Sequence, residues 1–282
     1  MIEKTDVIIM IDTETTNDID CPIVYDVGYQ VFTLNEGVLC ERSFVNADVF
    51  LDKDLMASAF FLDKVPNYWD EIKAGKRVLK KWFNIRKQIF EDCELFNVKY
   101  GCAHNALFDS RALNNTQRYQ TTSQSRYFLP YGIEWLDTLK MARQILKKDD
   151  SYGKFCSNNN YITKNGQRRY TAEIIYRWLS GKHDFVESHT GLEDVDIERQ
   201  IFEYFVNENP EINGLLWEDK MTWEQFYNFA LENYVNGGDA VVECWTEADF
   251  DDYVADCGPI TKTVAQKMFR DWSAICADIK NA

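Results

Sequence analysis

The sequence predicts an α/β fold in which helices flank a mixed five-stranded sheet, followed by a helical C-terminal extension. Three observations support this fold class. The first third of the chain reads as three strands, and two strand-to-helix steps follow it. Beyond Pro210 only helical periodicity remains. We therefore expect one domain over residues 1–208 and an acidic, mostly helical extension over residues 209–282.

The three early strands differ in pattern. Residues 7–11 form a continuous apolar run, which is typical of a strand buried on both faces. Residues 24–33 and 37–45 lie on either side of the turn sequence Asn35-Glu36-Gly37, which predicts a hairpin. An apolar stripe at helical spacing then predicts a helix over residues 78–90.

The middle of the chain alternates strands with helices. A strand at 98–103 precedes a helix from Ala106 with Asn105 as its cap, and a strand at 133–136 precedes a helix from Thr138 with Asp137 as its cap. Lysines 147 and 148 are expected in the last turn of that second helix, where cations suit its dipole. Residues 149–170 are polar and contain a two-residue hairpin turn at 165–166.

The remaining elements are helices with clear sequence signals. A helix over 172–180 stops at Gly181, and Thr190-x-x-Glu193 predicts a capping box that opens a long helix over about 191–208. Helical periodicity returns at 222–234, 246–254 and 261–279. The tryptophans of the extension are expected to lie in its core.

Composition narrows the possible functions. The longest apolar run is far shorter than the roughly 20 residues of a membrane span, and the first residues do not resemble a secretory signal, so we expect a cytoplasmic protein. Eight cysteines without a Cys-x-x-Cys pair, and only three histidines, argue against a zinc finger or ribbon. The net charge of −15 repels nucleic acid unless basic surface or metal ions act locally.

Several acidic residues are expected to point inward. Asp12 and Glu14 follow the apolar strand two residues apart and so share one face. Asp109 shares its helix face with apolar residues, and Asp194 heads another core-facing stripe, with His189 in the loop before it. Acid-x-acid pairs also arise by chance in loops. Because a buried carboxylate costs several kcal/mol unless it is paired or metal-bound, a shared cation site explains several of them best.

Three motifs carry a resemblance to a known family: Asp12-Thr13-Glu14-Thr15-Thr16, Ala103-His104-Asn105-Ala106-Leu107-Phe108-Asp109 and His189-x-x-x-x-Asp194. In this order they resemble the three motifs of the DEDDh exonucleases, and the match spans residues 7–206. A histidine five residues before Asp194 is typical of the histidine subclass. The segment Leu136-Asp137-Thr138-Leu139 also resembles a recurrent family segment, although we expect Asp137 to act as a helix cap.

The resemblance implies a ribonuclease H-like fold and hydrolysis of nucleotides from a 3′ end. We expect single-stranded DNA rather than RNA as the substrate. Two Mg²⁺ or Mn²⁺ ions are implied, with Asp12 bridging both, Glu14 and Asp194 holding the first, and Asp109 supporting the second. His189 would be the general base that activates the attacking water. The resemblance also suggests substrate contacts from the following residues: Thr13, Thr15, Thr16, His104, Asn105 and Phe108.

Other interpretations of the sequence stay open. The chain could be a 3′-exoribonuclease that trims short RNA, or a non-catalytic nucleic-acid-processing scaffold that has kept the fold. A carboxylate-pair glycosidase would leave Asp109 and Asp194 unexplained. The hairpin residues Lys164, Arg168 and Arg169 could hold a single strand, but a solvated hairpin is the simpler interpretation. The acidic extension could bind a polymerase or another protein.

Overall fold

The computed structural model describes residues 2–17, 21–122 and 127–281, and the chain divides into two compact units, Met1–Leu216 and Trp217–Ala282. The first unit therefore extends eight residues past the expected boundary at 208. The reason lies in residues 212–216, because Ile212 is buried in the core of the first unit and the Leu216 N–H donates to the Trp135 carbonyl at 2.8 Å.

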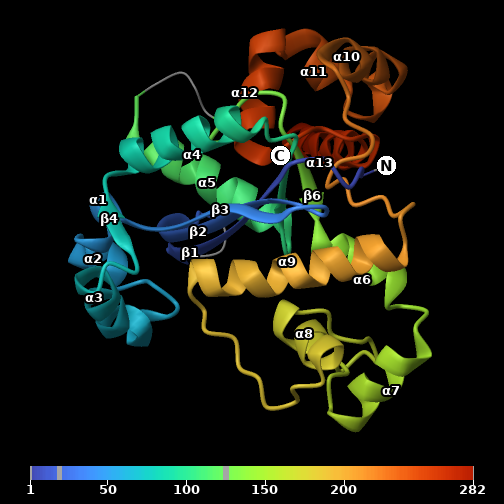
Figure 1. The fold of residues 1–282 in the computed structure, drawn as a ribbon. Coiled ribbons are helices and arrows are strands. Elements are labelled where there is room, and N and C mark those ends of the chain that lie inside the picture. Colours follow the sequence, from blue (N-terminus) through green and yellow to red (C-terminus); the bar gives the residue numbers. More distant parts are fainter. Residues whose placement is uncertain (1, 18–20, 123–126, 282) are drawn as a thin grey trace. The chain divides into compact units, whose positions relative to one another are not determined.

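A six-stranded mixed sheet forms the centre of the first unit, in the order β4-β3-β2-β1-β5-β6 (Figure 1). Neighbours β1–β2 and β2–β3 are antiparallel, whereas β3–β4, β1–β5 and β5–β6 are parallel. The strands are β1 (Ile8–Thr16), β2 (Ile23–Thr33), β3 (Gly37–Asn46), β4 (Val78–Lys80), β5 (Tyr100–Ala103) and β6 (Glu134–Asp137).

The expected five-stranded sheet was one strand short. The sequence pattern predicts Val78 and Leu79 in a helix, but they pair with Phe44 and Val45 as the short edge strand β4. The helix begins only at Trp82, because Lys81 before it has an extended backbone. A run of three residues is too short for its period to separate strand from helix in the sequence.

Helices cover both faces of this sheet. Figure 1 shows α9 on one face and α4 and α5 on the other. Among the described residues, no helix is both long and apolar enough to cross a membrane. The helices of the first unit are α1 (Ala47–Phe50), α2 (Lys53–Met56), η1 (Leu62–Lys64), α3 (Val65–Lys73), α4 (Trp82–Phe96), α5 (Ala106–Gln120), α6 (Thr138–Ile145), α7 (Asp150–Asn158), α8 (Ala172–Ser180) and α9 (Gly191–Glu208).

Alternation along β1 determines what each face of the sheet receives. Ile8 and Met10 are buried in one cluster with Val195 and Phe202 of α9. Residues two and four further along the strand therefore continue on the α9 face, and the residues between them turn toward α5. The polar end of β1 thus supplies side chains to both faces.

Two glycines let α9 start directly against the sheet. A Cβ at Gly28 would overlap the backbone of Gly191 and Leu192, and a Cβ at Gly191 would lie 2.6 Å from the Gly28 nitrogen. Gly28 is also paired with Asp12 across the β1–β2 ladder. The first turn of α9 is consequently pressed against the strand pair at the level of Asp12.

The helix caps follow the sequence signals only in part. Asp137 is confirmed as a cap, since its carboxylate accepts the Leu139 N–H at 2.9 Å. Asn105 is at the cap position of α5, but its φ of 73° is left-handed and its side chain makes no capping bond. Thr190 makes no capping bond either, and its hydroxyl donates to Glu193 at 2.8 Å. Lysines 147 and 148 lie beyond α6 rather than in its last turn.

The second unit is helical, with its own apolar core. Phe226, Phe250 and Phe269 are buried there, and tryptophans 223, 245 and 272 pack against the same cluster. Capping boxes open α10 at Thr222 and α12 at Thr246. Its helices are α10 (Trp223–Glu232), η2 (Tyr234–Asn236), α11 (Asp239–Cys244), α12 (Glu247–Cys257) and α13 (Lys262–Asn281).

Candidate active site

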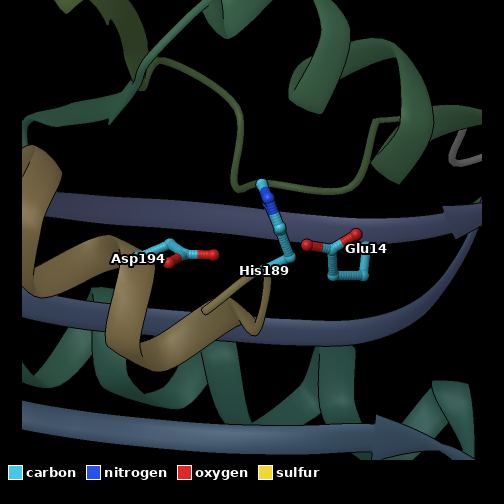
Figure 2. A group of neighbouring side chains, drawn as sticks. All are labelled: Glu14, His189 and Asp194. Carbon is cyan, nitrogen blue, oxygen red and sulfur yellow. The ribbon is translucent and has the colours of Figure 1, made fainter. Parts of the chain in front are cut away.

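A pocket of about 920 Å³ in the first unit collects most of the acidic side chains that the sequence singled out. Asp12 and Glu14 line it from β1, Asp194 from the first turn of α9, and His189 from the loop before that helix. Two segments that are 175 residues apart, counted from Glu14 to His189, therefore meet in one place. Figure 2 shows the carboxyl groups of Glu14 and Asp194 directed toward one another with His189 between them.

The apolar run at 7–11 suggests that Asp12 and Glu14 come after the strand. They lie inside it instead, because β1 continues to Thr16. Asp12 is opposite Gly28 and Glu14 is opposite Asp26 in the ladder, and a register shift follows Glu14. Because both residues continue the series of Ile8 and Met10, their carboxylates face α9.

Asp109 is buried at the start of α5, on the other side of β1. Its Oδ1 accepts a hydrogen bond from Thr13 Oγ1 at 2.8 Å, and it is not among the described residues that line the pocket. Its charge nevertheless contributes to raising the pKa of Asp12 and of Glu14. Asp109 is therefore close to the cluster electrostatically while its carboxylate is directed toward Thr13.

Asp194 is fixed in place by the turn that precedes α9. Its Oδ2 accepts the Thr190 N–H at 2.8 Å, and its Oδ1 accepts the Ser188 hydroxyl at 3.1 Å. The same turn is anchored further back, because the Gly191 N–H donates to Asp26 at 3.0 Å. With Arg77 also bound to Asp26 and Glu193, the first turn of α9 is held by a buried polar network.

His189 has a constrained position. Its φ of 54° lies in the left-handed region, and its ring stacks on Phe61 with centroids 4.1 Å apart and an interplanar angle of 11°. The ring is half-buried, and this burial lowers its pKa below the ordinary value. A neutral imidazole is thus favoured at pH 7.

The clustered carboxylates raise one another's pKa values. Burial is the main cause at each residue, and repulsion from the neighbouring carboxylates adds to it at Asp12 and Glu14. The pKa of Glu14 rises to about 9 and that of Asp194 to about 6, while the pKa of Asp12 rises well above its usual range. The pKa of Asp109 rises to about 7, mainly through burial.

The donor set fits a divalent cation. One ligand atom each from Glu14, His189 and Asp194 lies within 4.8 Å of the other two. Carboxylate oxygens are the ligands that hard ions such as Mg²⁺ and Mn²⁺ prefer. The raised pKa values show that ionising these carboxyl groups is unfavourable in the protein alone. A cation placed among them would stabilise the ionised forms, so these residues suit such an ion.

Two further carboxylates belong to the pocket and were not foreseen. Glu198 is buried and accepts the His104 N–H at 3.0 Å, and Glu187 lies in the loop before His189. Burial raises the pKa of Glu187 to about 8 and raises that of Glu198 well above its usual range. Glu198 follows Asp194 by four residues, so its helical spacing was a signal that could have identified it.

Two of the six expected substrate contacts, His104 and Asn105, line the pocket. Thr13 instead faces Asp109, and Thr16 is fully buried with its hydroxyl directed to the Ile23 carbonyl at 3.4 Å. These two threonines have structural partners because β1 continues past residue 11. Thr15 and Phe108 are partly buried and are not among the described lining residues.

His104 joins three parts of the site. Its Nε2 lies 2.7 Å from the Tyr170 carbonyl and its Nδ1 lies 2.8 Å from Thr138 Oγ1. Burial lowers the pKa of His104, which favours the neutral ring. A carbonyl can only accept, so Nε2 carries the proton and Nδ1 accepts from the threonine. Both ring nitrogens are therefore engaged within the fold.

No protein-family model matches the sequence, and no curated protein matches it. Three solved structures align with part of this chain. A structure of Exonuclease X in complex with 5′ overhanging duplex DNA has 14% identity and a TM-score of 0.39, covering 73% of this chain and 94% of that one. E. coli Exonuclease I in complex with a 5cy-dT13 oligonucleotide has 13% identity and a TM-score of 0.48, covering 73% and 41%.

A third structure, cell-death related nuclease 4 (CRN-4), has 10% identity and a TM-score of 0.34, covering 72% of this chain and 64% of that one. This chain thus spans less than two thirds of the length of the second and third structures. Because all three TM-scores are below 0.5, we draw no conclusion about function from these likenesses.

Proposed function

We propose that this chain is a metal-dependent 3′-5′ exonuclease that removes nucleotides from single-stranded nucleic acid, with DNA favoured over RNA. The observation that carries the proposal is the meeting of Asp12, Glu14 and Asp194 in one pocket beside His189. The 3′-5′ polarity comes from the resemblance of the three motifs to the DEDDh exonucleases.

Carboxylates would hold the metal in this proposal. Asp12 would bridge two Mg²⁺ or Mn²⁺ ions, Glu14 and Asp194 would hold the first, and Asp109 would support the second. When bound, the two cations would neutralise the carboxylates and the negative charge that develops on the phosphate. For Asp109 to contribute, its carboxylate must turn from Thr13 or act through an intervening water.

His189 would act as the general base. The burial that keeps its ring neutral leaves it able to accept a proton from the water that attacks phosphorus. Stacking on Phe61 restricts the ring, so that its position beside Glu14 and Asp194 is defined before substrate arrives. The water adds its oxygen to phosphorus, the bond to the 3′ oxygen of the preceding nucleotide breaks, and a nucleoside 5′-monophosphate is released.

Digestion of 5′-labelled oligonucleotides tests this function. DNA and RNA strands of one sequence are incubated with Mg²⁺, with Mn²⁺ or with EDTA, and the products are separated by length. We expect a ladder of 5′-labelled products with either metal and none with EDTA, with DNA shortened faster than RNA. Immediate release of the labelled end nucleotide contradicts the polarity, and intact strands under every condition contradict the nuclease itself.

A further inference from the structure

We propose that a basic wall of the same pocket, formed by Arg143, Lys147 and Arg169, binds the phosphates of the strand that adjoins the nucleotide to be removed. The inference rests on the proposed function and specifies its substrate class, because it requires a strand of several nucleotides rather than a single one. All three residues line the pocket that also contains Asp12 and Glu14.

The basic wall carries positive charge that the protein does not compensate. Within the described ranges, the side chains of Arg143, Lys147 and Arg169 make no hydrogen bond or ion pair, and all three are exposed. The partly or fully buried arginines 77, 177 and 199 of the same unit are instead each paired with carboxylates. In a chain of net charge −15, three unpaired cations in one pocket favour an anionic ligand.

The hairpin that carries Arg169 is fixed to the end of α6. Arg168 donates through Nη1 to the carbonyls of Leu146 and Asp149 at 2.5 and 2.7 Å, and its guanidinium lies against Gly153. The Tyr152 hydroxyl donates to the Arg169 carbonyl at 2.5 Å. Arg168 also lines the pocket, but the Leu146 and Asp149 carbonyls engage its guanidinium, so it stabilises the hairpin and is not counted in the basic wall.

The basic wall is also tied to the acidic side of the pocket. The His104 ring joins the Tyr170 carbonyl, next to Arg169, to Thr138 at the start of α6. The same residue donates its backbone N–H to Glu198. Arg143 lies in α6 and Lys147 in the turn directly after it, so both parts of the basic wall are carried by segments that His104 joins to the acidic cluster.

Opposite charges in one pocket match a polyanion that extends past the metal centre. The acidic cluster with its cations would take the phosphate that is cleaved, whereas Arg143, Lys147 and Arg169 would repel cations and attract phosphates. A single nucleotide offers only one phosphate and would engage the acidic end alone. A strand supplies the neighbouring phosphates that the basic wall needs.

Binding of an oligonucleotide at increasing salt tests the proposal. The probe is a short oligothymidylate with a 5′ fluorescein in a buffer that contains Ca²⁺. Its binding is measured by fluorescence anisotropy. The triple variant Arg143→Gln, Lys147→Gln, Arg169→Gln is compared with the unmodified protein. Each phosphate contact contributes about 0.7 to the slope of log K against log salt on single strands, so we expect the slope to fall in magnitude by about 2.

The chain offers a matched control. Lys148 and Lys164 are exposed neighbours of these residues and are not among the described residues that line the pocket. The double variant Lys148→Gln, Lys164→Gln should keep the slope of the unmodified protein. Equal slopes in the triple variant and the unmodified protein overturn the basic wall, as does an equal loss of slope in the control.

A second substrate separates this inference from the nuclease proposal. Thymidine 5′-(4-nitrophenyl phosphate) has one phosphodiester and no adjoining phosphate, so with Mn²⁺ the triple variant should lose much less kcat/KM on it than on the oligonucleotide. An equal fractional loss on both substrates overturns the assignment of these residues to the adjoining strand. If the unmodified protein hydrolyses neither substrate but its oligonucleotide binding depends on the three residues, the basic wall stands and the nuclease proposal fails.

Discussion

His189 has a constrained geometry in the proposed site. It combines a left-handed backbone, a ring stacked on Phe61 and a position between Glu14 and Asp194 (Figure 2). Its nitrogen is close enough to the carboxylates to serve as a metal ligand instead of a base. If His189 is a base, loss of the imidazole removes the proton acceptor. If it is a ligand, the same loss weakens metal binding.

Replacing His189 by Gln should separate a base from a ligand. We expect kcat to fall by roughly 10²–10⁴-fold, because the proton of the attacking water loses its acceptor. Mn²⁺ affinity, measured by isothermal titration calorimetry, should stay within a few-fold of the original. Glu14→Gln is the comparison, since it should weaken Mn²⁺ binding. A loss of Mn²⁺ affinity in His189→Gln equal to that in Glu14→Gln would make His189 a ligand.

Some residues of the site could be predicted from the sequence and others could not. The pair Asp12 and Glu14 was recognisable because charged residues directly follow an apolar run. Glu198 was missed, although it follows Asp194 by one helical turn, because its burial depends on how α9 packs on the sheet. Which face of β1 Asp109 packs against likewise depends on tertiary packing, and local sequence patterns do not encode that packing.

At the scale of elements, the contact between β2 and the start of α9 positions the site. Gly28 and Gly191 allow the two backbones to meet, and this brings Asp194 alongside Asp12. A buried ion pair between Arg77 and Asp26 stabilises the same junction. Arg77 Nη1 lies 3.1 Å from Asp26 Oδ2, and both side chains are almost fully buried.

Gly28→Ala should disturb this junction. The added methyl would overlap the backbone of α9, which cannot move aside as a side chain can, so we expect a loss of about 1–3 kcal/mol in the free energy of unfolding. Gly101→Ala is the matched control in β5, since its methyl would meet only side chains of Leu129 and Trp135 at 3.0–3.3 Å. Urea titration should show the larger loss for Gly28→Ala, and equal losses would contradict the close contact.

Arg77→Met should leave the Asp26 carboxylate buried without its cation. Removing one partner of a buried ion pair typically lowers the free energy of unfolding by about 3–5 kcal/mol. The double variant Arg77→Met, Asp26→Asn should recover part of that loss, because the uncompensated charge is gone. Chemical denaturation of the three proteins measures both quantities, and a single variant as stable as the original would show that the network contributes little.

The elements were predictable where their patterns are long. The apolar run at 7–11, the hairpin of β2 and β3 and the helix α9 follow directly from residue periodicity and turn sequences. The edge strand β4 and the short helices α1–α3, α7 and α11 were not predicted. Of these, β4, α1, α2 and α11 have six residues or fewer, which is too short for a period to identify them. Tertiary contacts determine their conformation.

At the scale of the whole molecule, the buried carboxylates link stability to pH and to metal. Their pKa values in the folded protein are raised, to about 6 for Asp194, 7 for Asp109, 8 for Glu187 and 9 for Glu14. A folded state that binds protons more tightly than the unfolded chain is stabilised at low pH. That stabilisation is complete below the unfolded pKa near 4 and is lost as pH rises through the folded values.

The metal-free protein should therefore become less stable as pH rises from about 5 to about 9. Added Mg²⁺ binds the ionised carboxylates and should raise Tm most at the upper end of this range. Thermal unfolding in EDTA and in Mg²⁺ at several pH values measures both trends. The variant Asp12→Asn, Asp194→Asn should flatten them, and a Tm increase with Mg²⁺ that is independent of pH contradicts a carboxylate-based site.

The proposed function requires the acidic cluster to hold two cations. Anomalous diffraction from crystals soaked in Mn²⁺ locates such cations, because the manganese signal does not depend on any assumed role of the residues. We expect two peaks about 3.5–4 Å apart, both beside Asp12, with one against Glu14 and Asp194 and the other on the side of Asp109. A map without manganese between these carboxylates, under conditions in which Mn²⁺ binds elsewhere on the protein, would contradict the claim.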